Sequence, residues 1–251
     1  MSLTLYALAS VIIVSLTSLI GVLTLRIKTS TLKKFSDIIV SFAVGAMFGD
    51  VFIHLLPETY AYFEKTDNLI LLFLPFVGIF MFFFIEKVLR WRHSHIPVTE
   101  TTTKPIATLS IAGDSLHNFI DGVIIGASYL ISLPMGLAST FAIILHEIPQ
   151  EMGDFGILLH AGIKADRALF FNFLSSLVAV IGTIIALAVG SNFSGFTNYL
   201  LPVAAGGFIY IAGTDLVPEL HQKTRIKHSL LQFAAIVAGI GAMAALLILG
   251  I

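Results

Sequence analysis

Eight apolar segments, each long enough to cross a lipid bilayer, divide the 251-residue chain. They lie at about residues 3–25, 36–56, 68–89, 106–130, 134–160, 166–190, 198–220 and 228–250. In hydrocarbon every backbone amide and carbonyl needs an internal partner, so segments of this length span as α-helices. The composition agrees, because 57% of the residues are hydrophobic, 12% are charged and the mean hydropathy is +0.97. We therefore predict an all-α integral membrane protein with eight transmembrane helices in a single domain, residues 1–251.

The composition also narrows the function. The chain has no cysteine, which excludes disulfides, thiolate metal sites and cysteine nucleophiles. Any metal would be held by imidazole, carboxylate, amide or water, which suit zinc, ferrous iron or manganese better than cuprous copper. The formal net charge is -1, so nothing indicates a nucleic-acid partner.

Basic residues are divided unevenly between the two sides of the predicted bundle. All but one of the 14 Lys and Arg residues flank the odd-numbered connections, and Lys65 alone lies opposite. The positive-inside rule then predicts cytoplasmic odd connections and two extracellular termini. The longest connection, residues 91–105, is predicted to be a flexible cytoplasmic loop. Its His93 and His95 could collect metal, although two histidines suit an ordinary solvated loop better.

A weaker pattern relates the second and seventh segments. The second carries Asp50 and His54 and ends in Leu56-Pro57-Glu58; the seventh carries Asp215 and ends in Val217-Pro218-Glu219. Because the two segments run in opposite directions, the pattern predicts an inverted repeat in a 3+2+3 arrangement, an architecture common in transporters. The alternative is that Pro and Glu simply mark helix ends near the interface.

The fourth segment carries His117, Asn118 and Asp121 at positions i, i+1 and i+4. On a helix, i and i+4 share a face and i+1 lies about 100° around, so the three form one polar wedge. The fifth segment repeats this spacing with His146, Glu147 and Gln150. Such groups are unfavourable in hydrocarbon and usually mark function.

The two segments run antiparallel through a turn near Pro134, so the two wedges can face each other at similar depth. Pro149 should open the turn beside the second wedge. We predict a divalent-metal site between the segments, with enough groups for one ion with a full shell or for two ions that share a carboxylate. Its predicted ligands are His117, Asn118, Asp121, His146, Glu147, Gln150 and Glu151.

Further polar residues could extend a metal path through the bundle. Asp114 and Asp154 extend the two wedges, whereas Asp50, His54 and Asn172 are single residues on other segments. Each of these three is better explained as a helix contact or a proton relay, with a place on the metal path as the alternative.

The two central segments resemble the ZIP family of divalent-metal transporters. Residues 117–122, HNFIDG, match its HNxxDG signature, and residues 146–151, HEIPQE, match HExPxE. Gly153-Asp154 extends the match toward the LIV-1 subfamily. The resemblance implies eight helices arranged 3+2+3, a homodimer, and a multi-pass protein of the cell membrane. It also implies uptake into the cytoplasm of zinc first, with iron, manganese and cadmium as further candidates.

The family's two-metal centre carries over by resemblance. His117, Asp121, His146, Glu147 and Gln150 match one site; Asn118, Asp121 and Glu147 match its neighbour, and Asn172 matches a further contact. Gln150 departs from the pattern, since LIV-1 sequences usually have histidine there. An amide oxygen is a weaker zinc ligand than imidazole, so this position puts the affinity or metal preference in question.

Two other functions remain as alternatives. An integral-membrane metalloenzyme such as a hydrolase would need a zincin HExxH motif, but Gln150 replaces the second histidine and Pro149 interrupts the turn. We therefore expect no enzyme. A metal-independent cation or proton channel should tolerate loss of the histidines. For a transporter, we expect alternating access in which the central pair moves against the outer triplets.

Overall fold

The computed structural model describes residues 2–21, 29–94, 103–193, 195–221 and 226–249, and these residues form helices without any strand. Helices that follow one another without a break are grouped here as one rod. The eight resulting rods overlap the eight apolar segments of the sequence. The first three rods are α1 with η1 (Leu3–Leu16, Thr17–Ile20), α3–η2–α4 (Thr29–Asp50, Val51–Leu55, Leu56–Thr66) and α5 (Ile70–Ser94). The central pair is α6 (Thr103–Ile131) and α7 (Leu133–His160). The last three are α8 with α9 (Ala165–Ser176, Val178–Asn192), α10–η3–α11 (Phe196–Ile211, Ala212–Leu216, Val217–Leu220) and α12 (Ile226–Leu249). The all-α prediction is confirmed.

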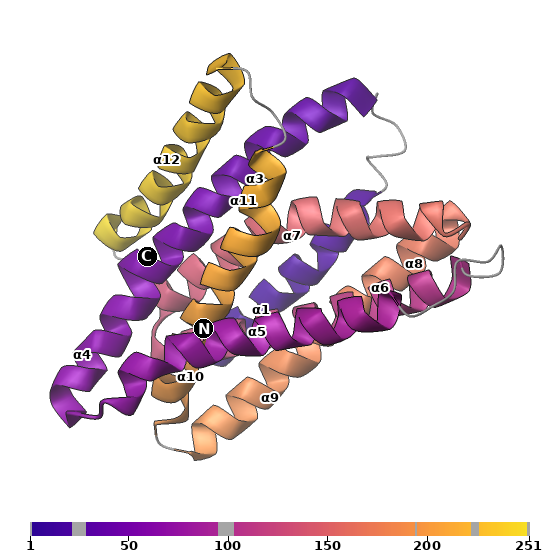
Figure 1. The fold of residues 1–251 in the computed structure, drawn as a ribbon. Coiled ribbons are helices and arrows are strands. Elements are labelled where there is room, and N and C mark those ends of the chain that lie inside the picture. Colours follow the sequence, from indigo (N-terminus) through magenta and orange to yellow (C-terminus); the bar gives the residue numbers. More distant parts are fainter. Residues whose placement is uncertain (1, 22–28, 95–102, 194, 222–225, 250–251) are drawn as a thin grey trace.

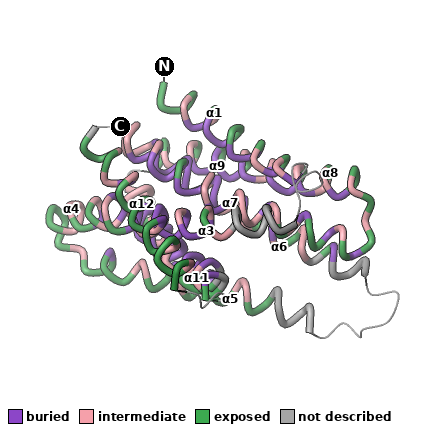
Figure 2. Tube along the Cα trace, turned by 90° about the horizontal axis from the view of Figure 1, so that it is seen from above, coloured by how far each residue is buried: buried purple, intermediate pink, exposed green. Residues whose placement is uncertain are grey.

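Six of the eight rods are long and apolar enough to cross a membrane. The other two, α6 and α7, have 29 and 28 residues, which is sufficient length, but they carry the polar wedges. Large apolar side chains cover much of the outside, including Phe73, Phe76, Phe80 and Phe84 on α5. Buried polar residues such as Asp50, Asn118 and Glu147 lie inside (Figure 2). This distribution is typical of a multi-pass membrane protein.

The turn between the central helices agrees with the sequence. Ser132 separates α6 from α7 and caps α7 by accepting a hydrogen bond from the Met135 amide, with Pro134 in the first helical turn. Farther along, α7 remains helical through Pro149. The helices also extend into the predicted loop 91–105, since residues 91–94 and 103–105 are helical; residues 95–102, with His95, lie outside the described residues.

The second and seventh rods each contain a π-helical turn. The two turns, Val51–Leu55 and Ala212–Leu216, stand directly before the Leu-Pro-Glu and Val-Pro-Glu sequences. A proline cannot donate to the carbonyl four residues earlier, and a π-turn accommodates the displaced chain. The first Pro-Glu pair therefore lies inside the second rod, whereas the second lies in the last described helical turn of the seventh rod.

Close helix contacts recur at a constant sequence separation. A Cβ on Gly45 would overlap the Ile236 carbonyl, and a Cβ on Gly206 would overlap the Pro75 carbonyl. Each member of the first pair is 161 positions from its counterpart in the second. Ser15 and Ser176 have the same separation, and each hydroxyl donates to the other residue's carbonyl at 2.9 Å. The contacts that join the first three rods to the last three are thus related in pairs by this separation.

The packing divides the bundle into two groups of rods (Figure 1). In the first group, α6 contacts α9, α7, α8 and α1; in the second, α3 contacts α12 and α5 contacts α10. Contacts of α3 with α7 and of α10 with α6 join the groups. The central helices therefore belong to the first group and contact the second, and their wedges are shielded from lipid.

We predict that Gly45→Ala destabilises the protein, because the new methyl would overlap the α12 backbone at Ile236, which has little freedom to move. Overpacking of this kind lowers the free energy of unfolding by about 1–3 kcal/mol. Gly241→Ala is the matched control, since a Cβ there meets no atom within 4 Å. A thermal melt in detergent should show a lower midpoint for Gly45→Ala only; equal midpoints would contradict the packing.

Candidate metal centre

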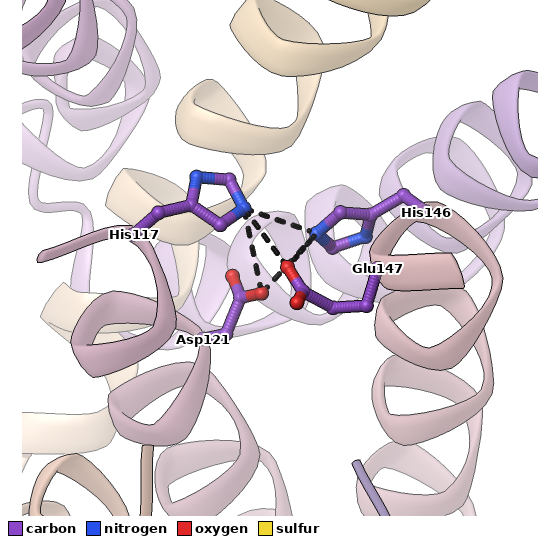
Figure 3. A group of neighbouring side chains, drawn as sticks. All are labelled: His117, Asp121, His146 and Glu147. Carbon is purple, nitrogen blue, oxygen red and sulfur yellow. Dashed lines mark hydrogen bonds and ion pairs between the residues drawn. The ribbon is translucent and has the colours of Figure 1, made fainter. Parts of the chain in front are cut away.

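Four side chains from the two central helices converge at one point (Figure 3). His117 and Asp121 lie one turn apart on α6, and His146 and Glu147 are adjacent on α7. One ligating atom from each lies within 4.8 Å of the others. Asp121, His146 and Glu147 are fully buried, whereas the His117 side chain retains 15% of its accessible surface. Access to the group is therefore through the His117 side.

The separations between these atoms suit a tetrahedral metal site. The His117 Nε2 atom lies 3.3 Å from both His146 Nε2 and Glu147 Oε1, and 3.6 Å from Asp121 Oδ2. His146 Nε2 lies 3.1 Å from Asp121 Oδ2 and 3.5 Å from Glu147 Oε1. Zinc binds nitrogen and oxygen ligands at about 2.0–2.1 Å, which makes the edges of its tetrahedron about 3.3 Å long. The five separations are close to that value.

A backbone contact orients the His146 ring. Its Nδ1 atom lies 3.2 Å from the Ala142 carbonyl, which can only accept, so Nδ1 carries the proton. In the neutral ring this leaves the Nε2 lone pair directed at the other three groups. Contacts of this kind commonly fix the tautomer of metal-binding histidines.

The group is incompletely satisfied by its own contacts. Glu147 Oε1 approaches both imidazoles but forms no hydrogen bond with acceptable geometry, and Glu147 Oε2 and Asp121 Oδ1 also lack partners. Buried polar atoms without partners are uncommon in folded proteins. Glu147 Oε1 is one of the four atoms that converge, as ligands of a cation do.

Asn118 points its amide nitrogen away from this point. That nitrogen donates to Asp114 Oδ1 at 2.8 Å, and Asp114 also accepts a hydrogen bond from Ser175 of α8. Because a carboxylate can only accept from the amide NH₂, the Asn118 Oδ1 atom is left free, buried and without a partner. Asp114 therefore orients Asn118 in this structure.

Glu151 and Asn172 form a similar pair. Asn172 Nδ2 donates to Glu151 Oε2, while Asn172 Oδ1 and Glu151 Oε1 are buried without partners. Glu151 follows Glu147 by one turn of α7, so the two carboxylates share a face. Glu147, a member of the four-residue group, thus carries unpartnered oxygens. So do its neighbours along the helices, Asn118 and Glu151, and Asn172, which bonds Glu151.

Four predicted residues have other surroundings. Asp154 Oδ1 accepts a hydrogen bond from Ser110 at 3.0 Å, which joins α7 to α6. Asp50 and His54 lie 3.3 Å apart on the second rod, and Asp50 Oδ2 accepts from Ser139 of α7. Gln150 is half-buried one turn beyond His146 and makes no hydrogen bond to a described residue. Its role as a ligand stays a prediction.

Several serines that position these groups were missed by the sequence analysis. Ser175 and Ser139 donate to Asp114 and Asp50 from positions 61 and 89 residues away. Ser128 in turn donates to Ser139 at 3.1 Å. No spacing rule could have found partners on different rods, since serine is also common in apolar helices at packing positions.

An apolar-surfaced helical bundle that encloses converging imidazoles and carboxylates defines a class: multi-pass membrane proteins with a candidate transition-metal site. Comparisons with known proteins identify the family. The sequence profile described as ZIP Zinc transporter matches residues 1–107 and 98–247. The chain belongs to the ZIP family.

Three relatives show how far the similarity extends. The metal cation symporter ZIP8 of Rattus norvegicus is 31% identical, over 88% of this chain and 64% of its own length. The zinc transporter ZIP13 of Danio rerio is 32% identical, over 83% of this chain and 75% of its own length. The zinc transporter ZIP10 of Homo sapiens is 41% identical over 51% of this chain and 15% of its own length. All three are named as transporters rather than enzymes.

We predict that His146→Ala weakens zinc binding more than about 100-fold, since even loss of an outer contact to a metal ligand weakens binding about 10–100-fold. The control is His160→Ala, which removes an exposed histidine of the same helix. Equilibrium dialysis of the detergent-solubilised protein would measure both. Equal affinities for the two variants would exclude His146 as a ligand.

Proposed function

We propose that this protein carries divalent metal ions across the cell membrane into the cytoplasm. Zinc is the first candidate substrate, and iron, manganese and cadmium are further candidates. The observation that carries the proposal is the buried group of His117, Asp121, His146 and Glu147, with contacts of 3.1–3.3 Å between the two helices. The membership of this chain in the ZIP family and the names of its relatives, a metal cation symporter and a zinc transporter, support the proposal.

The charge of the group supports a cation substrate. Two carboxylates buried together repel each other and lose hydration, and a divalent ion bound between them would offset both effects. The neighbouring free oxygens of Asn118 and Glu151 supply hard ligands for a second ion, with Glu147 able to bridge. We therefore propose a binuclear site, with Asn172 as a further contact.

We further propose that all eight rods span the membrane in a 3+2+3 arrangement with an inverted repeat. The paired contacts at a separation of 161 residues support this arrangement, as do the two π-turns before Leu-Pro-Glu and Val-Pro-Glu. The central helices do not follow the separation of 161 residues. Their corresponding residues His117 and His146, which face each other, are 29 positions apart. The homodimer that the resemblance implies stays a prediction.

The packing favours a different moving unit from the one expected from the sequence. Gly122 and Gly182 bring the α6 and α9 backbones into direct contact, so α6 cannot slide along α9 without separating from it. Gly45 and Gly206 join α3 to α12 and α10 to α5 in the same way. We infer that the central pair moves together with α1, α8 and α9 against the other rods, rather than alone against both triplets.

Asp50 and His54 suit a position on the outer part of the path. Asp50 accepts a hydrogen bond from Ser139 of α7. Ser139 precedes His146 by seven residues, which is about 10 Å along the helix. That displacement is toward Pro134, the side predicted to be extracellular. Asp50 Oδ1 and both nitrogens of His54 are buried without a hydrogen bond and could contact a passing ion.

We predict that proteoliposomes with this protein take up zinc and that Asp121→Ala combined with His146→Ala reduces the initial rate at least about 100-fold, because half of the converging ligands are lost. His160→Ala should transport as the unaltered protein does. Uptake would be followed with a zinc-sensitive dye inside the vesicles. No uptake of any divalent metal by the unaltered protein would refute the proposed function, whereas undiminished uptake by the double variant would refute the site.

The absence of cysteine makes the proposed topology directly testable. A single cysteine at Asn68, between α4 and α5, should react with an impermeant maleimide added outside intact cells. A single cysteine at Lys164, between α7 and α8, should react only after the cells are permeabilised. Labelling of both positions from outside would contradict the eight-span arrangement.

A further inference from the structure

A cavity of about 470 Å³ lies away from the metal centre, between the first described turns of α6, the α7–α8 turn and α8. Its lining is almost wholly apolar and includes Ala107, Ile111, Ala112, Ile163 and Phe171. The volume falls in the usual range of small-molecule sites, about 300–1,000 Å³. A hydrated cation would find no ligands there, so the cavity is not part of the metal path.

The cavity belongs to an apolar cluster separate from the main core. Ala107 of α6, Phe155 and Leu158 of α7, and Ala161 and Ala168 near α8 form this cluster. The ends of α6, α7 and α8 meet at one end of the bundle, opposite the turn between α4 and α5 (Figure 1). By the distribution of basic residues this end is cytoplasmic.

Two basic residues lie close along the chain to residues that line the cavity. Lys164 directly follows the lining residue Ile163, and Arg167 precedes the lining residue Phe171 by one turn, on the same face of α8. Both are exposed, and neither forms an ion pair with a described residue. Asp166 lies five residues before Phe171 and hence on another side of α8.

We propose that this cavity binds an anionic phospholipid from the cytoplasmic leaflet, with an acyl chain against Ile111 and Phe171 and the headgroup phosphate at Lys164 and Arg167. Basic pockets between transmembrane helices on the cytoplasmic side are suited to such headgroups. The proposal rests on the membrane placement in the proposed function, but not on metal transport.

The lipid would contact the helices that hold the metal centre. Ile111 follows Ser110, whose hydroxyl joins α6 to Asp154 of α7, and Phe171 precedes Asn172, which donates to Glu151. An acyl chain between α6 and α8 therefore fills the space beside both contacts. Bound lipid would stabilise this arrangement of the cytoplasmic helix ends.

The test is native mass spectrometry of the detergent-solubilised protein with palmitoyl-oleoyl phosphatidylglycerol or the matching phosphatidylcholine. The unaltered protein should retain phosphatidylglycerol preferentially. Replacing both Lys164 and Arg167 by Gln should weaken retention roughly 25-fold, since each basic residue near a membrane surface contributes about fivefold. Lys65→Gln removes an exposed cation from α4, at the other end of the bundle, and should have no effect.

Ala112→Phe tests the acyl chain, because position 112 lines the cavity and is exposed, so a phenyl group can occupy the space without overpacking the core. This variant should lose phosphatidylglycerol, and glycerol 3-phosphate should not displace the lipid from the unaltered protein. Equal retention of the two lipids would overturn the headgroup assignment. Full retention by Ala112→Phe, or displacement by glycerol 3-phosphate, would overturn the cavity assignment. Zinc uptake by proteoliposomes reconstituted with the same proteins separates failure of this proposal from failure of the proposed function.

Discussion

Burial of two carboxylates at one point, facing two imidazoles, is the interaction on which the rest of this structure depends. Asp121 and Glu147 are fully buried, and their oxygens approach His117 and His146 without satisfying all of their hydrogen-bonding capacity. Such a group is unfavourable in a membrane unless protein shields it from lipid and a cation offsets its charge. The surrounding rods provide the shielding, and the proposed substrate provides the charge.

Close backbone contacts make this enclosure possible. Gly122 and Gly182 let α6 lie directly against α9, while Gly45 and Gly206 do the same for the second group of rods. In hydrocarbon, helices associate through close packing and hydrogen bonds rather than through a hydrophobic effect, so small residues carry much of the interaction. Close packing within each of the two groups of rods is what the proposed alternating access would require of the bundle.

Much of this was predictable because lipid restricts the backbone so strongly. Apolar length located all eight rods, and helix periodicity grouped His117 with Asp121 and His146 with Glu147. The role of Pro57 and Pro218 was not predictable. Their Pro-Glu pairs could mark helix ends by sequence alone, but the rods continue through π-turns there. Likewise, Ser175 and Ser139 bond Asp114 and Asp50 across distant rods, and no local spacing reveals this.

The sequence by itself determined the helical class, the two polar wedges and the antiparallel turn near Pro134, because each follows from apolar length, local periodicity and the proline. Only the tertiary structure decided which atoms converge. It turned the Asn172 amide so that its oxygen remains free, and it brought His117 and Asp121 of α6 to the Nε2 atom of His146 on α7. It also created the apolar cavity beside Lys164. These features depend on contacts between rods, which helix periodicity within one segment cannot specify.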